Sequence, residues 1–194
     1  MKPDTEHASA NFGFLAEHDS LLADLGAAAE RVFASDPNTT LIKLRQLGEA
    51  LAQHLAALSG IEFDDQTSQS DLLYRLSREL RLEPQVKALF HTLRIEGNKA
   101  THQFRTRHKE AMDGLKLARE LAVWFHKSFG NAGIAFKPGP FSPPSDPSGE
   151  LRQLHSGIEK LRHDLQQANM ELDSSQQLAQ LIEKEKAEYE ALAV

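Results

Sequence analysis

Cysteine is absent from the sequence, and this absence narrows the chemistry available to the protein. Without thiols the chain can have no disulfide scaffold, no cysteine nucleophile, and no zinc or iron–sulfur site held by thiolates. Long apolar runs are also missing: none approaches the ~20 residues of a membrane span. Residues 1–7 lack the apolar core of a signal peptide. We therefore expect a cytoplasmic protein with no membrane partner.

The net charge of −6 is unevenly distributed along the 194 residues. Residues 1–74 carry a charge of −8, residues 75–127 carry +6, and residues 128–194 carry −4. A local basic region can attract phosphate even when the whole chain is acidic. The alternative is that these cations lie on solvated helix faces and bind nothing. The central region is thus the candidate for a contact with phosphate groups.

Apolar residues recur at helical spacing along most of the chain, so the sequence predicts an all-α fold without a convincing β-strand. We expect a compact helical domain of about five helices over residues 10–130. Asp36-Pro37 is a strong helix start, because aspartate caps and proline fits the first helical position. The expected helices, in chain order, cover residues 14–32, 37–60, 72–80, 84–96 and 107–129.

Residues 131–148 hold five of the eight prolines of the chain, together with several glycines. Proline removes backbone donors and resists helix formation, so this stretch predicts a Pro/Gly-rich linker or an arm lying over the surface. Phe136 and Phe141 within it favour an arm that docks in places.

Residues 149–194 predict one long heptad-patterned, coiled-coil-like helix. Its apolar seam, with residues three and four positions apart, is Leu151, Leu154, Ile158, Leu161, Leu165 and Leu172. A helix with one apolar stripe must bury that stripe, so we expect a homodimer or packing on another helix. The chain ends without a capping residue, which predicts that this helix is truncated.

Two stretches are unusually specific: residues 36–49, which begin Asp36-Pro37-Asn38, and residues 89–102, which contain Gly97-Asn98. With residues 122–126 and 139–144, they resemble the amino-terminal helical domain of unknown function of type I restriction enzyme R (HsdR) subunits. That domain is related to HEPN-type helical domains. The resemblance implies a parent protein that is an ATP-dependent, DNA-translocating, site-specific deoxyribonuclease. It also implies ATP and Mg²⁺ for the parent, and partners among the other subunits of a restriction-modification complex.

The chain itself contains no phosphate-loop motif, so we expect no cofactor, no metal site and no catalytic residue within it. Phosphate or nucleic-acid contact is the chemistry that its central residues suit. We expect Gly97 to turn the backbone and Asn98 to lie in that turn and bond neighbouring amides, with His102 at or near the start of the next helix, where amides favour anions. The candidate contact residues are Arg94, Asn98, His102, Arg105, Arg107 and Lys109.

A structural alternative is that Asn98 and His102 staple a helix–loop–helix junction. Three functions stay open at this point. The first is a noncatalytic accessory module of a restriction R subunit. The second is an independent HEPN-like RNase or toxin, although seven residues separate Arg94 from His102, more than the active motif has; Arg119 and His126 match its spacing but share one helix. The third is a dimerising scaffold.

Overall fold

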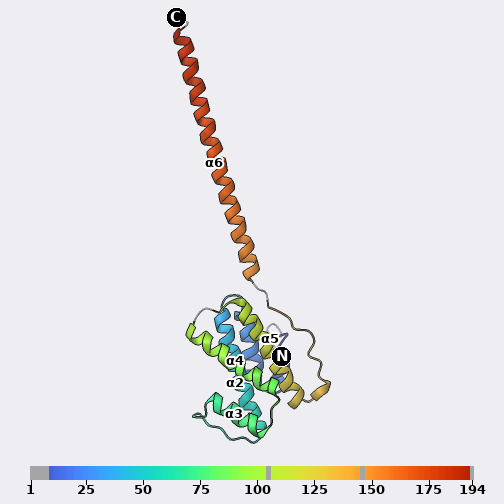
Figure 1. Ribbon diagram of the computed structural model, residues 1–194. Helices are drawn as coiled ribbons and strands as arrows, with labels where there is room; N and C mark the ends of the chain where they lie inside the picture. The colour runs from blue at the N-terminus through green and yellow to red at the C-terminus, as the bar shows by residue number, and fades with distance from the viewer. Residues whose placement is uncertain (1–8, 104–105, 145–146, 193–194) are drawn as a thin grey trace. The chain divides into compact units, whose positions relative to one another are not determined.

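The computed structural model describes residues 9–103, 106–144 and 147–192, and within these residues it is helical without a strand. Figure 1 shows a helical domain followed by a long helix, so the all-α prediction is confirmed. The chain divides into two compact units, Met1–Asp146 and Pro147–Val194. The elements are η2 (Gly13–Glu17), α1 (Ser20–Val32), α2 (Pro37–Leu58), α3 (Gln69–Glu79), α4 (Pro84–Gln103), α5 (His108–Phe129), η3 (Gly133–Ala135) and α6 (Pro147–Leu192).

Helix α2 is the central element of the first unit, because it packs against α1, α3, α4 and α5 (Figure 1). Its start follows the sequence signal: the Asp36 carboxylate accepts a hydrogen bond from the Thr39 amide at 2.9 Å, and Pro37 occupies the first turn. Its leucines face several neighbours at once and are buried: Leu41, Leu44, Leu47, Leu51 and Leu55. This burial supplies most of the driving force that holds the neighbouring helices around α2.

The first expected helix is two elements, which corrects the prediction of one helix over residues 14–32. The 3₁₀ turn η2 ends at Glu17, and α1 starts at Ser20. Asp19 causes the break, since its backbone is extended and its carboxylate caps the Leu21 amide at 2.9 Å. The apolar periodicity survives across the break, because Leu15, Leu22 and Ala29 are all fully buried.

Gly97 and Asn98 do not interrupt the fourth helix, contrary to the sequence prediction. Helix α4 continues through both residues to Gln103. Gly97 is buried where α4 crosses α2. A Cβ atom added at Gly97 would overlap the Cβ, Cγ and Cδ atoms of Arg45. The glycine thus serves close helix packing rather than a turn.

The Pro/Gly-rich stretch lies against the helical domain as an arm. Arg119 of α5 donates hydrogen bonds from Nη2 to the carbonyls of Pro138 and Gly139, at 2.7 and 2.9 Å. Asn11 is fully buried, and its side chain exchanges two hydrogen bonds with the Ser142 backbone, at 2.6 and 2.9 Å. Phe136 packs against Phe14, with ring centroids 5.0 Å apart. The backbone carbonyls of this arm thus accept hydrogen bonds from side chains instead of from the backbone amides of a helix or sheet.

Helix α6 runs unbroken from Pro147 to Leu192 and confirms the predicted long carboxy-terminal helix. The described seam side chains are solvent-exposed in the single chain: Leu154 by 62 %, Ile158 by 40 %, Leu161 by 69 %, Leu165 by 64 % and Leu172 by 56 %. The Leu151 side chain lies outside those described. Among the described residues, no helix combines the length and apolar character needed to cross a membrane.

A pair of histidines, the half-buried His18 at the end of η2 and the buried His126 of α5, joins these two elements. His126 is 3 % exposed, and its Nδ1 lies 3.0 Å from Nε2 of His18, within hydrogen-bonding distance. The Phe136 ring of the arm packs on His126 with centroids 4.3 Å apart. Burial lowers the pKa of His18, and the nearby His126 and His54 lower it further, while Glu17 opposes them. Folding therefore favours the neutral form of His18.

The lowered pKa of His18 predicts that acid weakens the fold. Between the ordinary histidine pKa of about 6.5 and the lowered value, the unfolded chain binds more protons than the folded one, so stability falls as pH falls. We expect the melting temperature to drop between about pH 7 and pH 5, and to drop less in the His18→Gln variant. The carboxylates with lowered pKa values, Asp36, Asp64 and Glu110, titrate below this interval. Identical pH profiles for the two proteins would contradict this account.

Candidate interaction site

The two specific sequence stretches meet at the crossing of α2 and α4. Arg45 of α2 donates from Nη1 to Oδ1 of Asn98 at 3.1 Å and forms an ion pair with Glu49 at 3.2 Å. Leu93 packs where α4 passes Gly48, and both residues are buried. The residues that make these stretches distinctive are thus largely partners of one another, and Asn98 holds two helices together rather than forming a turn.

The junction between α4 and α5 is stapled by Asn38. Its Nδ2 donates to the carbonyl of Ala100 at 2.6 Å, and its Oδ1 accepts from the Thr106 hydroxyl at 2.6 Å. A staple was expected at this junction, but from Asn98 and His102. His102 lies in the last turn of α4 and is exposed, so it is not at the start of the next helix. The staple comes from a residue more than sixty positions away in sequence, which local spacing cannot reveal.

The predicted phosphate-binding residues that the structure describes are spread over α4 and the start of α5. Arg94 and His102 lie eight positions apart on α4, about 12 Å along its axis. Arg107 precedes α5 and is held by Glu110, whose carboxylate accepts from its Nη2 at 2.7 Å. That same hydrogen bond lowers the pKa of Glu110. Lys109 is exposed at the start of α5. Arg105 lies outside the described residues.

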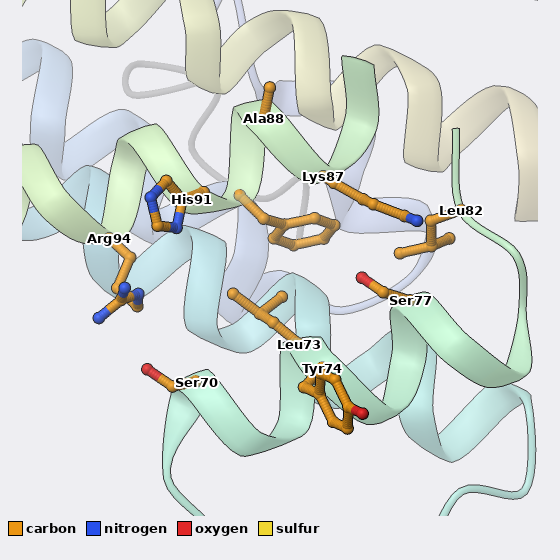
Figure 2. A pocket seen from close by; sticks show the side chains of 10 residues that line it. Ser70, Leu73, Tyr74, Ser77, Leu82, Lys87, Ala88, His91 and Arg94 are labelled. Carbon is orange, nitrogen blue, oxygen red and sulfur yellow. The ribbon is translucent and has the colours of Figure 1, made fainter. Parts of the chain in front are cut away.

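Arg94 instead belongs to a groove between α3 and α4, with a volume of about 430 Å³ (Figure 2). One wall is formed by Lys87, His91 and Arg94, which are spaced four and three positions apart and so share one face of α4. Figure 2 shows Leu73 between the two helices and Ser70 on the facing wall, near the Arg94 end. Lys87 and His91 were not among the candidate residues predicted from the sequence, although basic residues at helical spacing on one face of α4 are a signal for this site.

The Arg119–His126 pair, which has the residue spacing of an RNase motif, is engaged in structure. Arg119 holds the carbonyls of the arm, and His126 is buried against His18 and Phe14. Both side chains of the pair are thus taken up by packing and hydrogen bonds within the first unit.

The described residues also do not fit the ATP and Mg²⁺ that the resemblance implies for a parent protein. Within the described ranges, no group of three or more histidine, aspartate or glutamate side chains could hold a metal ion. The sequence has no phosphate-loop motif. No chemical step through ATP or Mg²⁺ is therefore assigned to this chain.

Comparison with known proteins places a large part of the first unit in a family. The model of the family described as "Domain of unknown function (DUF4145)" matches residues 27–123, half of the chain. The chain belongs to the DUF4145 family. The matched residues run from the middle of α1 to the last turns of α5 and include the α2–α4 crossing and the α3–α4 groove.

The DUF4145 domain is also similar to a curated relative. The type I restriction enzyme EcoKI endonuclease subunit of Escherichia coli (strain K12) is 38 % identical over 117 residues, which is 60 % of this chain. The matched region makes up only 10 % of that subunit. No solved structure matches the chain significantly. These findings support the resemblance to restriction R subunits, which was carried by the two stretches around Asn38 and Asn98.

The staple at the α4–α5 junction predicts that Asn38 matters more for stability than His102. Asn38→Ala removes two short hydrogen bonds and leaves the Ala100 carbonyl without its partner, so we expect it to lower the free energy of unfolding by about 1–2 kcal/mol. His102→Ala is the matched control at an exposed position and should change stability by less than about 0.5 kcal/mol. Urea unfolding measures both. Equal losses in the two variants would contradict the assignment.

Proposed function

We propose that the chain is a noncatalytic accessory and interaction module of a type I restriction endonuclease subunit. The observation that carries the proposal is the 38 % identity to the EcoKI endonuclease subunit over 117 residues. The parent protein would be an ATP- and Mg²⁺-dependent deoxyribonuclease. The match covers 10 % of that subunit, and we assign docking to this module and the chemistry to the rest of the parent protein.

The noncatalytic role is supported by what the polar residues already do. Arg45 and Asn98 hold α2 to α4, Arg119 holds the arm, and His126 is buried against His18. Side chains committed to structure in this way are not free to position a substrate. These commitments also weigh against the independent HEPN-like RNase or toxin.

The partners in this proposal are the other subunits of the restriction-modification complex, and DNA is a second contact. Residues 75–127 carry a charge of +6, and Lys109 at the start of α5 is exposed. Binding to DNA through this face would be weak, independent of sequence and steeply dependent on salt, because neutralising phosphates releases counterions.

The test combines two measurements on the purified full chain. We expect it to show no ATPase or nuclease activity and to co-purify with the methyltransferase core of a type I system when both are expressed together. Metal-dependent DNA cleavage that a point substitution in the chain abolishes would overturn the noncatalytic role. A methyltransferase core that never co-purifies with the chain would overturn the docking role.

The exposed seam of α6 favours a further candidate function, the dimerising scaffold. Leaving several leucines exposed forfeits several kcal/mol at ~25 cal/mol per Å² of buried apolar surface, so pairing with a second copy would stabilise the helix. Ile158 is β-branched and occupies a core-facing heptad position, which is compatible with a parallel two-stranded coiled coil.

If α6 holds a dimer, we expect sedimentation equilibrium to give twice the molecular mass of a single chain. Replacing both Ile158 and Leu165 by aspartate should return the protein to a monomer, while Gln167→Asp, on the polar side of the helix, should leave the dimer intact. Helical content and the melting transition of the first unit should stay unchanged in both variants. A monomeric wild-type chain at high concentration would contradict the scaffold.

A further inference from the structure

The groove between α3 and α4 combines a basic wall with an apolar floor. Its cationic residues Lys87 and Arg94 lie seven positions apart, about 10 Å along α4, with His91 between them. No aspartate or glutamate is among the residues that line it. Among the described residues neither Lys87 nor Arg94 forms a salt bridge. Both charges are therefore available to a partner.

The facing wall is neutral and follows the same period. Ser70, Tyr74 and Ser77 are spaced four and three positions apart on α3, so they form one face opposite the cations (Figure 2). Tyr74 is 63 % exposed. Two helical walls with matching periodicity form the kind of groove into which the ridge of a third helix packs.

The floor determines the kind of side chain that the groove can receive. Leu73, Leu82 and Phe90 supply apolar surface at the bottom, between the two walls. Apolar side chains of a partner would be removed from water there, and burying one leucine is worth about 1.5–3 kcal/mol. The occupant must therefore present apolar side chains and acidic side chains on one surface.

We propose that the α3–α4 groove docks an acidic amphipathic helix of a partner protein. Leucine-like side chains of that helix would lie on Leu73 and Phe90. Two carboxylates seven positions apart, which share a helix face two turns apart, would face Lys87 and Arg94. The inference deepens the proposed function and rests on it for the identity of the partner as a subunit of the same complex.

Single-stranded nucleic acid fits this groove less well. The two permanent cations would neutralise about two phosphates, and affinity for nucleic acid rises with the number of phosphates neutralised. The apolar floor adds little for a phosphate backbone. One face of the Tyr74 ring already carries the Arg78 guanidinium, 5.9 Å from its centroid, which halves the surface on which a base could stack.

The test uses the full chain and a fluorescent alanine-based peptide of about 15 residues, long enough to form a helix. The peptide carries two leucines four positions apart and two glutamates seven positions apart on one face. We expect saturable binding that weakens about tenfold when Lys87 and Arg94 are both replaced by glutamate. A peptide with lysines in place of the glutamates should bind the double variant better than the wild type.

The matched control is Lys116→Glu with Lys137→Glu, which changes net charge equally at exposed positions outside the groove. It should bind the acidic peptide within about twofold of the wild type. Circular dichroism melts establish that each variant is folded. Equal weakening in the groove and control variants would overturn the proposal, because it would show nonspecific attraction. Absence of peptide binding would overturn it too.

The last binding experiment uses a labelled thymidine oligonucleotide in place of the peptide. Groove-dependent binding of this strand without binding of the peptide would replace the proposal by a nucleic-acid site. The proposed function and the groove proposal can fail independently of each other. A chain that co-purifies with the methyltransferase core but does not bind the peptide refutes only the proposal that the groove docks an acidic helix. A chain that binds the peptide but not the core refutes only the restriction-complex role.

Discussion

The close crossing of α2 and α4 is the constraint on which the rest of the helical domain depends. Gly97 lets α4 approach Arg45, whose guanidinium then reaches Asn98, and the same approach brings Asn38 onto the carbonyl of Ala100. With α4 fixed at Gly97 and Asn98, the same stripe of the helix continues toward its start through Arg94, His91 and Lys87, which line the groove against α3. One packing contact therefore sets both the α4–α5 junction and the geometry of the groove.

Local rules predicted much of this fold. Aspartate and proline at 36–37 cap α2, the leucines of α2 are buried, and the aromatic residues of the arm dock, all in accord with spacing and cap chemistry. The errors lie where one residue type serves two purposes. Glycine followed by asparagine is typical of turns, yet here glycine allows helix packing and asparagine bonds a neighbouring helix. Asp19 was overlooked as a cap because apolar periodicity continues across the break.

The candidate site was only partly predictable. Arg94 was selected from the sequence as a phosphate ligand, but its neighbours in space are the wall residues of α3, which no local pattern connects to it. Asn38 lies in one of the two specific stretches, but its role could not be predicted because its hydrogen-bond partners are distant in sequence. The DUF4145 match spans the α2–α4 crossing and the groove together. The matched region therefore contains both the residues that pack at the crossing and the residues that line the groove.

Replacing Gly97 by alanine tests the central crossing most directly, because two effects of opposite sign compete. At an unobstructed helical position, alanine would stabilise the protein by up to ~1 kcal/mol. The overlap with Arg45 predicts instead a loss of about 1–3 kcal/mol in the free energy of unfolding. Gly157→Ala in α6, where no atom lies within 4 Å of the added Cβ, is the control and should not destabilise. A Gly97→Ala protein as stable as the wild type, or more stable, would contradict the account.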